Sequence, residues 1–312
     1  MKHFHKGTLK NTLALVKNSF TLIGGTSDIK KPMVNLAILS VVMSTLFFTA
    51  LGCFFSGKAI LTGISLMAIV LLILVPLRFF LRTYFKAVMS RITYQASIGQ
   101  PVAYGDASRH TRGRASGLMF VGLVDMLVAH ATRQGDRDSG VIGIIKSLLM
   151  SALAEVWDLL NHYMIPAIVI EEKPLKQCIP EIKALRNNVP ATLVGVFGID
   201  VAGDIGKGFL FLPSLALVGI GIGIGYLIGP AFPSLSWEIA GHAISWLPPL
   251  VSLYLSVALG GVLQAGVESL KAIYFTIFYT TIMHPDRIPE AHREQLTNYL
   301  QHSAQQPGVN PS

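Results

Sequence analysis

Residues 140–170 read GVIGIIKSLLMSALAEVWDLLNHYMIPAIVI, an apolar stretch long enough to cross a lipid bilayer. Four ionisable side chains interrupt it, those of Lys146, Glu155, Asp158 and His162. At 100° per residue, the last three lie within about 60° of one another on one helix face, whereas Lys146 points the opposite way. Because a charge in hydrocarbon costs roughly 2.5–3.5 kcal/mol on insertion scales, this face must meet protein or water. The stretch therefore predicts a polytopic membrane protein with a polar interior.

The composition of the whole chain indicates the same class of protein. Of its 312 residues, 52% are hydrophobic and only 13% are charged, whereas soluble domains carry about 25% charged residues. The net charge of +8 does not indicate a nucleic-acid partner, because the basic residues flank apolar segments and form no aromatic-interleaved patch elsewhere. The two cysteines have no spacing typical of a zinc or haem site. We therefore expect no metal and no cofactor.

Apolar and polar runs predict three regions along the chain. Residues 1–30 form an amphipathic N-terminal segment, which either lies on an anionic leaflet or packs on the bundle. A mitochondrial presequence has a similar composition and is the less favoured interpretation. Residues 31–285 form a membrane helical domain, and residues 286–312 form a cytoplasmic tail with a disordered end. The fold class is all-α, a bundle of about six transmembrane or re-entrant helices with amphipathic helices on the cytoplasmic side.

Two hydrophobic helices and one shorter apolar region are expected before the central stretch. Residues 33–55 and 59–80 each match one bilayer crossing, and the second helix continues beyond the bilayer. The next helix begins with basic residues and becomes apolar over 115–131. Because this apolar part is short and holds Asp125, the region 115–170 either spans the bilayer or re-enters it.

The second half of the chain has two long apolar runs. Residues 190–229 would make a helix of ~60 Å, twice the thickness of the hydrocarbon, so we expect Pro213 to break it. Glycines recur every two residues over 219–225, so either two of them face a neighbouring helix or this part is not regular helix. Residues 230–246 are expected to form a loop or short helix, and residues 247–283 the last hydrophobic helix.

The distribution of basic residues predicts the orientation in the membrane. For six spans, 20 of the 25 Lys and Arg residues fall on the side that contains both termini, and three fall on the other side. Cytoplasmic loops carry an excess of Lys and Arg, so both termini are expected in the cytoplasm.

The central stretch holds the first candidate for a translocation path or polar core. Glu155, Asp158 and His162 have the chemistry to relay a proton or a cation along one helix face. Alternatively, they form a buried polar seam that locks one helix against another, with Lys146 or Lys207 as the opposite charge. The sequence leaves both alternatives open.

A second candidate group lies in the apolar run that follows. Asp200, Asp204 and Lys207 share one helix face at spacings of i, i+4 and i+7. Asp204 and Lys207 either neutralise each other or belong to a solvated face at the membrane interface. Asp125 is a further polar-core candidate, and Glu268 is expected to pair with a lysine of its own helix.

Basic residues follow the second predicted span at helical spacing. Arg78, Arg82 and Lys86 are four residues apart and form a stripe, and Arg91 continues the basic segment. Such side chains extend along apolar surface and place their charge among lipid phosphates. We therefore expect them to contact lipid headgroups, in preference to forming an anion-selective ring.

Several motifs resemble a known family. WDLLNHYMIPAIVIEEKPLKQCI at 157–179, LRNNVPATLVGVFGI at 185–199, GQPVAYGDA at 99–107 and AIYFTIFYTTI at 272–282 are similar to a family of uncharacterised prokaryotic integral membrane proteins. The resemblance implies six helices and the inner (plasma) membrane of a bacterium. It brings no activity and no catalytic residue. The layout also resembles, more distantly, the sulfate-permease family of the cysteine-synthesis membrane protein.

The ionisable groups in apolar segments favour a role in transport. The leading hypothesis is an oligomeric channel or transporter for ions or small solutes. The alternative is a non-transporting scaffold or accessory subunit that binds partner proteins or shapes lipid, as the amphipathic segments suggest. An enzyme is not expected, because HExxH and hydrolase motifs are missing and GIGIGIG lacks the GxGxxG spacing. The expected partners are the lipid bilayer and further copies of the chain.

Overall fold

The computed structural model of the protein describes residues 27–57, 59–135, 157, 161, 163–172, 177 and 189–290. These residues are mostly helical and form two compact units. Unit 1 contains the described residues of Met1–Val34, Phe79–Ala202 and Val267–Ser312, and unit 2 those of Asn35–Arg78 and Gly203–Gly266. The predicted membrane domain at 31–285 therefore contributes residues to both units.

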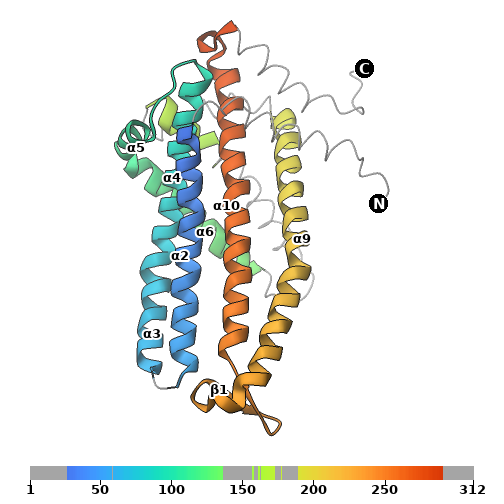
Figure 1. Cartoon of the computed structure of the whole chain (residues 1–312). Coiled ribbons are helices and arrows are strands. Elements are labelled where there is room, and N and C mark those ends of the chain that lie inside the picture. Colours follow the sequence, from blue (N-terminus) through green and yellow to red (C-terminus); the bar gives the residue numbers. More distant parts are fainter. Residues whose placement is uncertain are drawn as a thin grey trace. The chain divides into compact units, whose positions relative to one another are not determined.

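Helices make up nearly all of the described elements (Figure 1). They are η1 (Ser27–Ile29), α2 (Lys30–Phe55), α3 (Ile60–Ile69), η2 (Val70–Leu74), α4 (Val75–Ser97), α5 (Tyr104–Arg112), α6 (Ala115–Gly135), α9 (Val189–Ile228), η4 (Gly229–Ala231), η5 (Pro233–Leu235), α10 (Leu247–Met283) and η6 (Pro285–Arg287). Residues 163–170 are also helical. Two short strands, β1 (Ser236–Ile239) and β2 (His242–Ser245), pair antiparallel.

Four of the described helices are long and apolar enough to cross a membrane: Ser27–Phe55, Ile60–Ser97, Gly206–Ala231 and Leu247–Met283. A fifth is obtained if Tyr104–Arg112 and Ala115–Ala131, which are bent by 80°, count as one span. The helices predicted at 33–55, 59–80 and 247–283 are confirmed as helices. The stretch 140–170 lies largely outside the described residues, so the part of the chain that is described has four or five such helices where six were expected for the whole.

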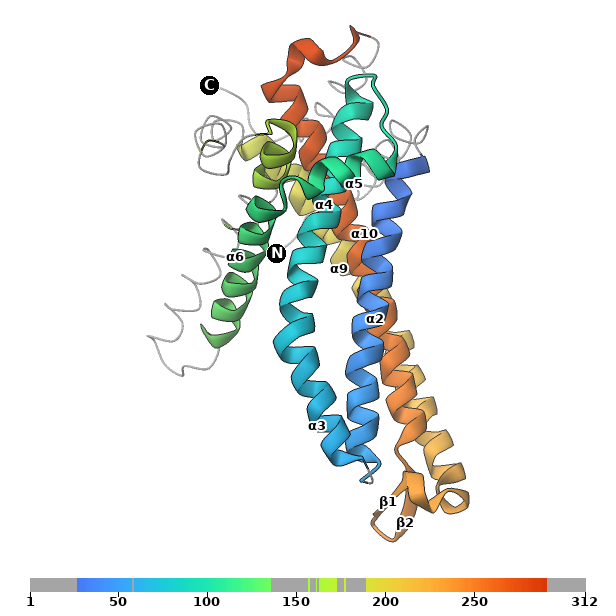
Figure 2. The same ribbon diagram turned by 90° about the vertical axis from the view of Figure 1, so that its left-hand side faces the viewer.

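The segments of unit 2 lie in the order α3, α2, α10, α9 (Figures 1 and 2). Glycines stand where neighbouring segments meet. A Cβ atom at Gly63 of α3 would lie 2.8 Å from the backbone nitrogen of Phe54 in α2, and one at Gly261 of α10 would lie 3.1 Å from the Cβ atom of Ser40 in α2. Cβ contacts as short as the first are essentially never seen, so α3 can pack on α2 at this distance only because residue 63 is glycine, and the second contact is tighter than most.

The outer surface of unit 2 is apolar. Leu61 of α3 is 78% exposed and Phe209 of α9 is 77% exposed, and many other large apolar side chains on α2, α9 and α10 are exposed as well. A soluble monomer rarely exposes a contiguous apolar patch of this extent. This surface is therefore suited to a hydrocarbon environment.

The glycine run of α9 is regular helix, and two of its four glycines face the end of β2 and the start of α10. A Cβ atom at Gly221 would lie 2.9 Å from the carbonyl oxygen of Pro248, and one at Gly225 would overlap the carbonyl oxygen of Ser245. Cβ atoms at the other two glycines, 219 and 223, would meet nothing within 4 Å. The first of the two sequence alternatives is thus confirmed, with the four-residue spacing that close helix packing uses.

The expectation that Pro213 breaks the long apolar run is wrong. Helix α9 continues from Val189 to Ile228 with Pro213 inside it. A proline costs one backbone hydrogen bond and crowds the preceding turn. Contacts with α10 on both sides of it, through Gly206 and Gly221, hold the two halves of the helix in line.

Residues 236–245 form a β-hairpin, where the sequence suggested a loop or short helix. Its two-residue loop, Ala240-Gly241, has φ values of +51° and +80°. Positive φ at both central residues is the requirement of the turn that matches the twist of paired strands. The ring of Trp237 in β1 packs edge-to-face on Phe55, with 5.0 Å between the ring centroids. The all-α class therefore holds for the described residues apart from this hairpin.

Unit 1 has a densely packed core. It is formed by the second half of α4, residues 163–170 and the second half of α10, and its fully buried side chains include Met89, Ile92, Ile168, Phe275 and Tyr279. Helix α4 ends in a Schellman motif, in which Gly99 (φ +75°) donates to the Ala96 carbonyl and Gln100 to the Gln95 carbonyl at 2.8 Å.

The glycines of α9 allow a matched test of this packing. Replacing both Gly221 and Gly225 by Ala should lower the free energy of unfolding by about 1–3 kcal/mol, because the new methyl groups would overlap the backbone of α10 and of β2. Replacing the two open glycines at 219 and 223 by Ala should leave it unchanged or raise it, because Ala favours helix over Gly by about 1 kcal/mol. Thermal unfolding in detergent micelles measures both, and equal shifts for the two pairs would contradict this packing.

Candidate functional site

A buried ion group joins α4 to α10 within unit 1. The carboxylate of Glu268 accepts two contacts from the guanidinium of Arg82, and the ammonium of Lys86 lies 3.6 Å from the same carboxylate. The side chains of Glu268 and Lys86 are only 8% and 5% exposed. Arg82 and Lys86 are one helical turn apart on α4, so both reach the same residue of α10.

The sequence suggested other partners for these charged side chains. The expected pairing of Glu268 with a lysine of its own helix stays a prediction, and its carboxylate meets two cations that lie more than 180 residues earlier in the chain. The headgroup contacts expected for Arg82 and Lys86 stay a prediction. Arg78, at the start of the same stripe, is exposed.

A second carboxylate has three basic neighbours. Glu172 follows the helical segment 163–170, and its oxygens lie 3.4 Å from Arg91, 3.2 Å from the Nε2 atom of His110 and 3.8 Å from Arg114. These groups come from α4, from α5 and from the turn before α6. The backbone of Glu172 has φ +58°, a left-handed conformation that a residue with a side chain adopts only where its surroundings impose it.

The histidine in this cluster is biased toward its neutral form. Burial lowers the pKa of His110, and the positive charges of Arg91 and Arg114 lower it further, while Glu172 opposes them. The polar helix α5 carries this residue beside several basic groups. The charge of Glu172 is therefore balanced at neutral pH by guanidinium groups rather than by the imidazole.

The adjacent carboxylate turns to a different set of partners. Glu171 accepts a hydrogen bond from the hydroxyl of Tyr279 at 2.9 Å, and the Nε2 atom of His284 lies 2.6 Å from the same oxygen. Both partners belong to the C-terminal end of α10 and the residue after it. Two consecutive glutamates thus tie residues 163–172 to α4 and α5 on one side and to α10 on the other.

Asp125 is the one residue of the predicted polar core whose side-chain partners are described. Its Oδ1 atom accepts hydrogen bonds from the indole nitrogen of Trp157 at 3.3 Å and from the amide of Asn161 at 3.4 Å. Trp157 and Asn161 belong to the motif that the family resemblance rests on. This aspartate therefore links α6 to two described residues of the central stretch.

The other predicted site residues are placed only in part. Lys146, Glu155, Asp158 and His162 lie outside the described residues. Asp200 and Asp204 belong to α9, but their side chains are not among those that the structure describes. Lys207 is exposed on the same helix. Within the described ranges, no three His, Cys, Asp or Glu side chains converge as metal ligands.

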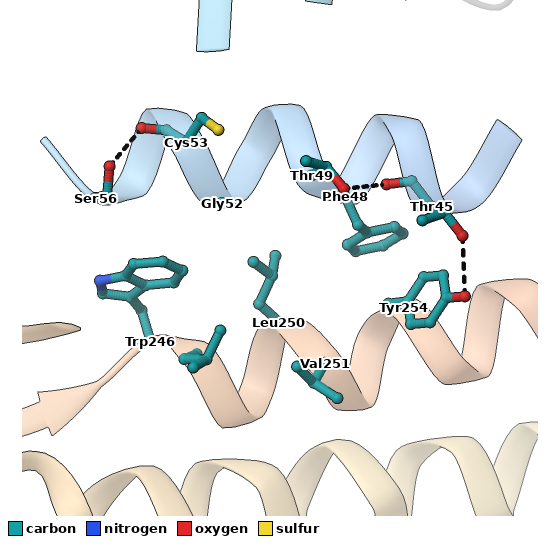
Figure 3. A pocket seen from close by; sticks show the side chains of 11 residues that line it. Thr45, Phe48, Thr49, Gly52, Cys53, Ser56, Trp246, Leu250, Val251 and Tyr254 are labelled. Carbon is teal, nitrogen blue, oxygen red and sulfur yellow. Dashed lines mark hydrogen bonds between the residues drawn. The ribbon is translucent and has the colours of Figure 1, made fainter. Parts of the chain in front are cut away.

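Unit 2 contains an apolar groove. A groove of about 450 Å³ lies between α2 and α10, with Trp246 at one end and Tyr254 at the other (Figure 3). The Thr45 and Tyr254 hydroxyls share a hydrogen bond of 3.0 Å, and Ser56 donates to the Cys53 carbonyl (Figure 3). The groove offers apolar walls and hydroxyls already engaged with their own surroundings, which suits an apolar group rather than an ion.

Sequence reasoning missed the paired glutamates at 171 and 172. Their signal was present, because two acids directly follow the apolar run that ends at Ile170. Their partners were not predictable, since they come from helices up to about 110 residues away in the chain.

Comparison with known proteins assigns no role to these groups. No protein-family model matches the chain, and neither a curated protein nor a solved structure matches it. The family resemblance carried by residues 157–179 stays a prediction. Function is therefore inferred from the residues and their geometry.

A double-mutant cycle tests the buried ion group. Glu268→Gln should lower the free energy of unfolding by about 3 kcal/mol, because it leaves the buried ammonium of Lys86 and the partly exposed guanidinium of Arg82 without this carboxylate. Lys86→Met should cost less, because Arg82 still neutralises Glu268. The double variant should be more stable than the sum predicts, with a coupling energy of about 1–3 kcal/mol. Chemical unfolding in micelles measures these free energies, and the substitution of exposed Glu238 by Gln is the control. The pairing is contradicted if the effects of the two single substitutions simply add in the double variant.

Proposed function

We propose that the chain is an integral membrane protein whose unit 2 crosses the bilayer. Each of its four helical segments has about 20 residues or more, which at 1.5 Å per residue matches ~30 Å of hydrocarbon. The charged residues of unit 2 stand only at the ends of these segments: Lys58, Arg78, Asp204, Lys207 and Glu238. The exposed apolar side chains between them support this proposal.

Four crossings place both termini on one side of the membrane. The turn at 56–59 and the hairpin at 236–245 then lie on the other side, with few basic residues. The excess of Lys and Arg supports a cytoplasmic location for the termini, in the inner membrane of a bacterium.

Cysteine labelling tests this orientation. In a background without Cys53 and Cys178, a cysteine at position 58 should react with a membrane-impermeant maleimide added to intact cells. A cysteine at position 290 should react only after lysis, because the proposed topology puts it in the cytoplasm. Carbonate extraction should leave the protein in the membrane pellet; the reverse labelling pattern would refute the orientation.

We further propose that the protein conducts or transports an ion or small solute. The observation that carries this is the ion group of Glu268, Arg82 and Lys86, which lies in two helices that belong to candidate membrane spans. Ionisable side chains are rare in such helices, and they mark ion and substrate paths more often than other positions do.

The path for such a solute requires more than one copy of the chain. The described segments of unit 2 carry hydroxyls but no charge between their ends, and hydroxyls such as those of Ser44 and Thr49 donate to their own helix backbone. A hydrated ion would therefore find no charged lining within the described part of unit 2 in one chain. This supports a homo-oligomer in which the path runs between subunits.

A specific observation favours the alternative, a non-transporting scaffold or accessory subunit. Glu171, Glu172 and Glu268 each have close partners from other elements. Such satisfied pairs also serve to lock helices together without any solute passing. A scaffold would need these groups for stability alone.

Flux measurements separate the two functions. Purified protein in liposomes should raise ion or solute flux above that of protein-free liposomes. Glu268→Gln and Lys86→Met should change the rate or the selectivity by about tenfold, which corresponds to ~1.4 kcal/mol. Exposed Glu238→Gln should leave the flux unchanged. If the wild-type protein passes no K⁺, Na⁺, H⁺ or Cl⁻, while the variants lose only stability, the scaffold explains the ion group and transport does not.

A further inference from the structure

Unit 1 contains a polar pocket of about 460 Å³ beside the C-terminal end of α4. Its polar lining residues are Arg91, Tyr94, Gln95, Gln100, Glu172 and Arg287. They come from α4, from the Schellman turn after it, from the end of segment 163–172 and from η6. Pockets of this volume accommodate small organic ligands as well as single ions.

Arg287 supplies a fixed positive charge to this pocket. Its Nη1 atom donates to the hydroxyl of buried Tyr94 at 2.8 Å. This hydrogen bond raises the pKa of Arg287, so its guanidinium stays charged at every accessible pH. The bond uses one of the five N–H donors of the group. A planar fork of donors therefore remains for a ligand.

Arg91 supplies the second positive charge and is held loosely. Its Nη1 atom lies 3.4 Å from Glu172 and 3.4 Å from the Val169 carbonyl oxygen. Charge-assisted hydrogen bonds of full strength are about 2.7–2.9 Å long. An oxyanion in the pocket thus competes with weak contacts for this guanidinium.

The charge balance of the pocket favours an anion. Glu172 is the single acid among the lining residues, against Arg91 and Arg287, and Arg114 lies 3.8 Å from the same carboxylate. Glu171 is hydrogen-bonded to Tyr279 and lies against His284, and its charge also acts on Arg287. The side-chain amides of Gln95 and Gln100 add neutral donors. Guanidinium pairs with amide donors match the geometry of phosphate oxygens.

We propose that this pocket binds a phosphate-type oxyanion, as a soluble phosphate ester or as the headgroup of an anionic lipid. The assignment does not depend on transport, since it concerns a pocket of unit 1 separate from the Glu268 group. Glu172 takes part by its contact with Arg91, which lines the pocket. Tyr94 takes part by orienting Arg287.

Binding to the full-length protein tests this site. Glycerol 3-phosphate and inorganic phosphate are titrated in neutral detergent micelles by calorimetry, and phosphatidic acid is compared with phosphatidylcholine in nanodiscs. Arg287→Gln and Arg91→Gln should each weaken binding of at least one phosphate probe by about tenfold or more, since a hydrogen bond to a charged group is lost. Arg112→Gln, which removes an equal charge from an exposed position of α5, should change it less than twofold.

The pattern of binding identifies the source of the phosphate. Affinity for glycerol 3-phosphate indicates a soluble ester, whereas affinity for phosphatidic acid alone indicates a lipid headgroup. Arg287→Lys should bind with intermediate affinity, because it keeps the charge but loses the fork. If one variant does not fold, the other gives the result. The proposal fails if no phosphate probe binds at millimolar concentration, or if Arg91→Gln and Arg287→Gln bind as tightly as Arg112→Gln.

Discussion

Glu268 stands where α10 changes its surroundings. Before it, large apolar side chains such as Val257 and Leu259 are exposed, and after it nearly every side chain up to Thr280 is buried. Helix α4 changes in the same way, from exposed Leu77 to buried Ala87 and Val88. A carboxylate removed from water requires opposite charge nearby, and Arg82 and Lys86 provide it. The pairing of α4 with α10 in unit 1 depends on this requirement.

Different interactions stabilise the interior of each unit. Unit 1 uses buried aromatic packing and charged pairs, in which each glutamate bridges elements that are distant in sequence. In unit 2, the described helices approach one another through glycines at the contacts. The difference follows from the solvent: close van der Waals packing still stabilises helices in hydrocarbon, where apolar burial gives little driving force.

These differences bear on function. A unit with apolar faces and hydroxyl groups suits a place in the bilayer, whereas a unit rich in arginine and glutamate presents groups that recognise charged ligands. The polar pocket at Arg91 and Arg287 and the buried group at Glu268 are separate features of unit 1, and each has its own chemistry. The first has donors open to a ligand, and the second is enclosed between two helices.

Hydrophobic runs alone determined the main helices, because a helix of a given length needs only local hydrogen bonds and an apolar sequence. The helices at 33–55, 59–80 and 247–283 were predictable for this reason, as was the basic stripe on α4. The continuation of α9 through Pro213 was not, since contacts with α10 on both sides of the proline override its local cost. Which of the four glycines face a neighbour was likewise decided by that neighbour.

The candidate sites depended on tertiary structure even more strongly. Sequence identified Asp125, Arg82 and Lys86 as unusual residues but gave no means of finding their partners. Glu268 is 186 residues from Arg82, and Arg287 is 193 residues from Tyr94. The sequence does not show which charged or hydrogen-bonding groups meet, because any of several pairings satisfies the same electrostatic requirement. Only the packing of α4, α10 and residues 163–172 selects one of them.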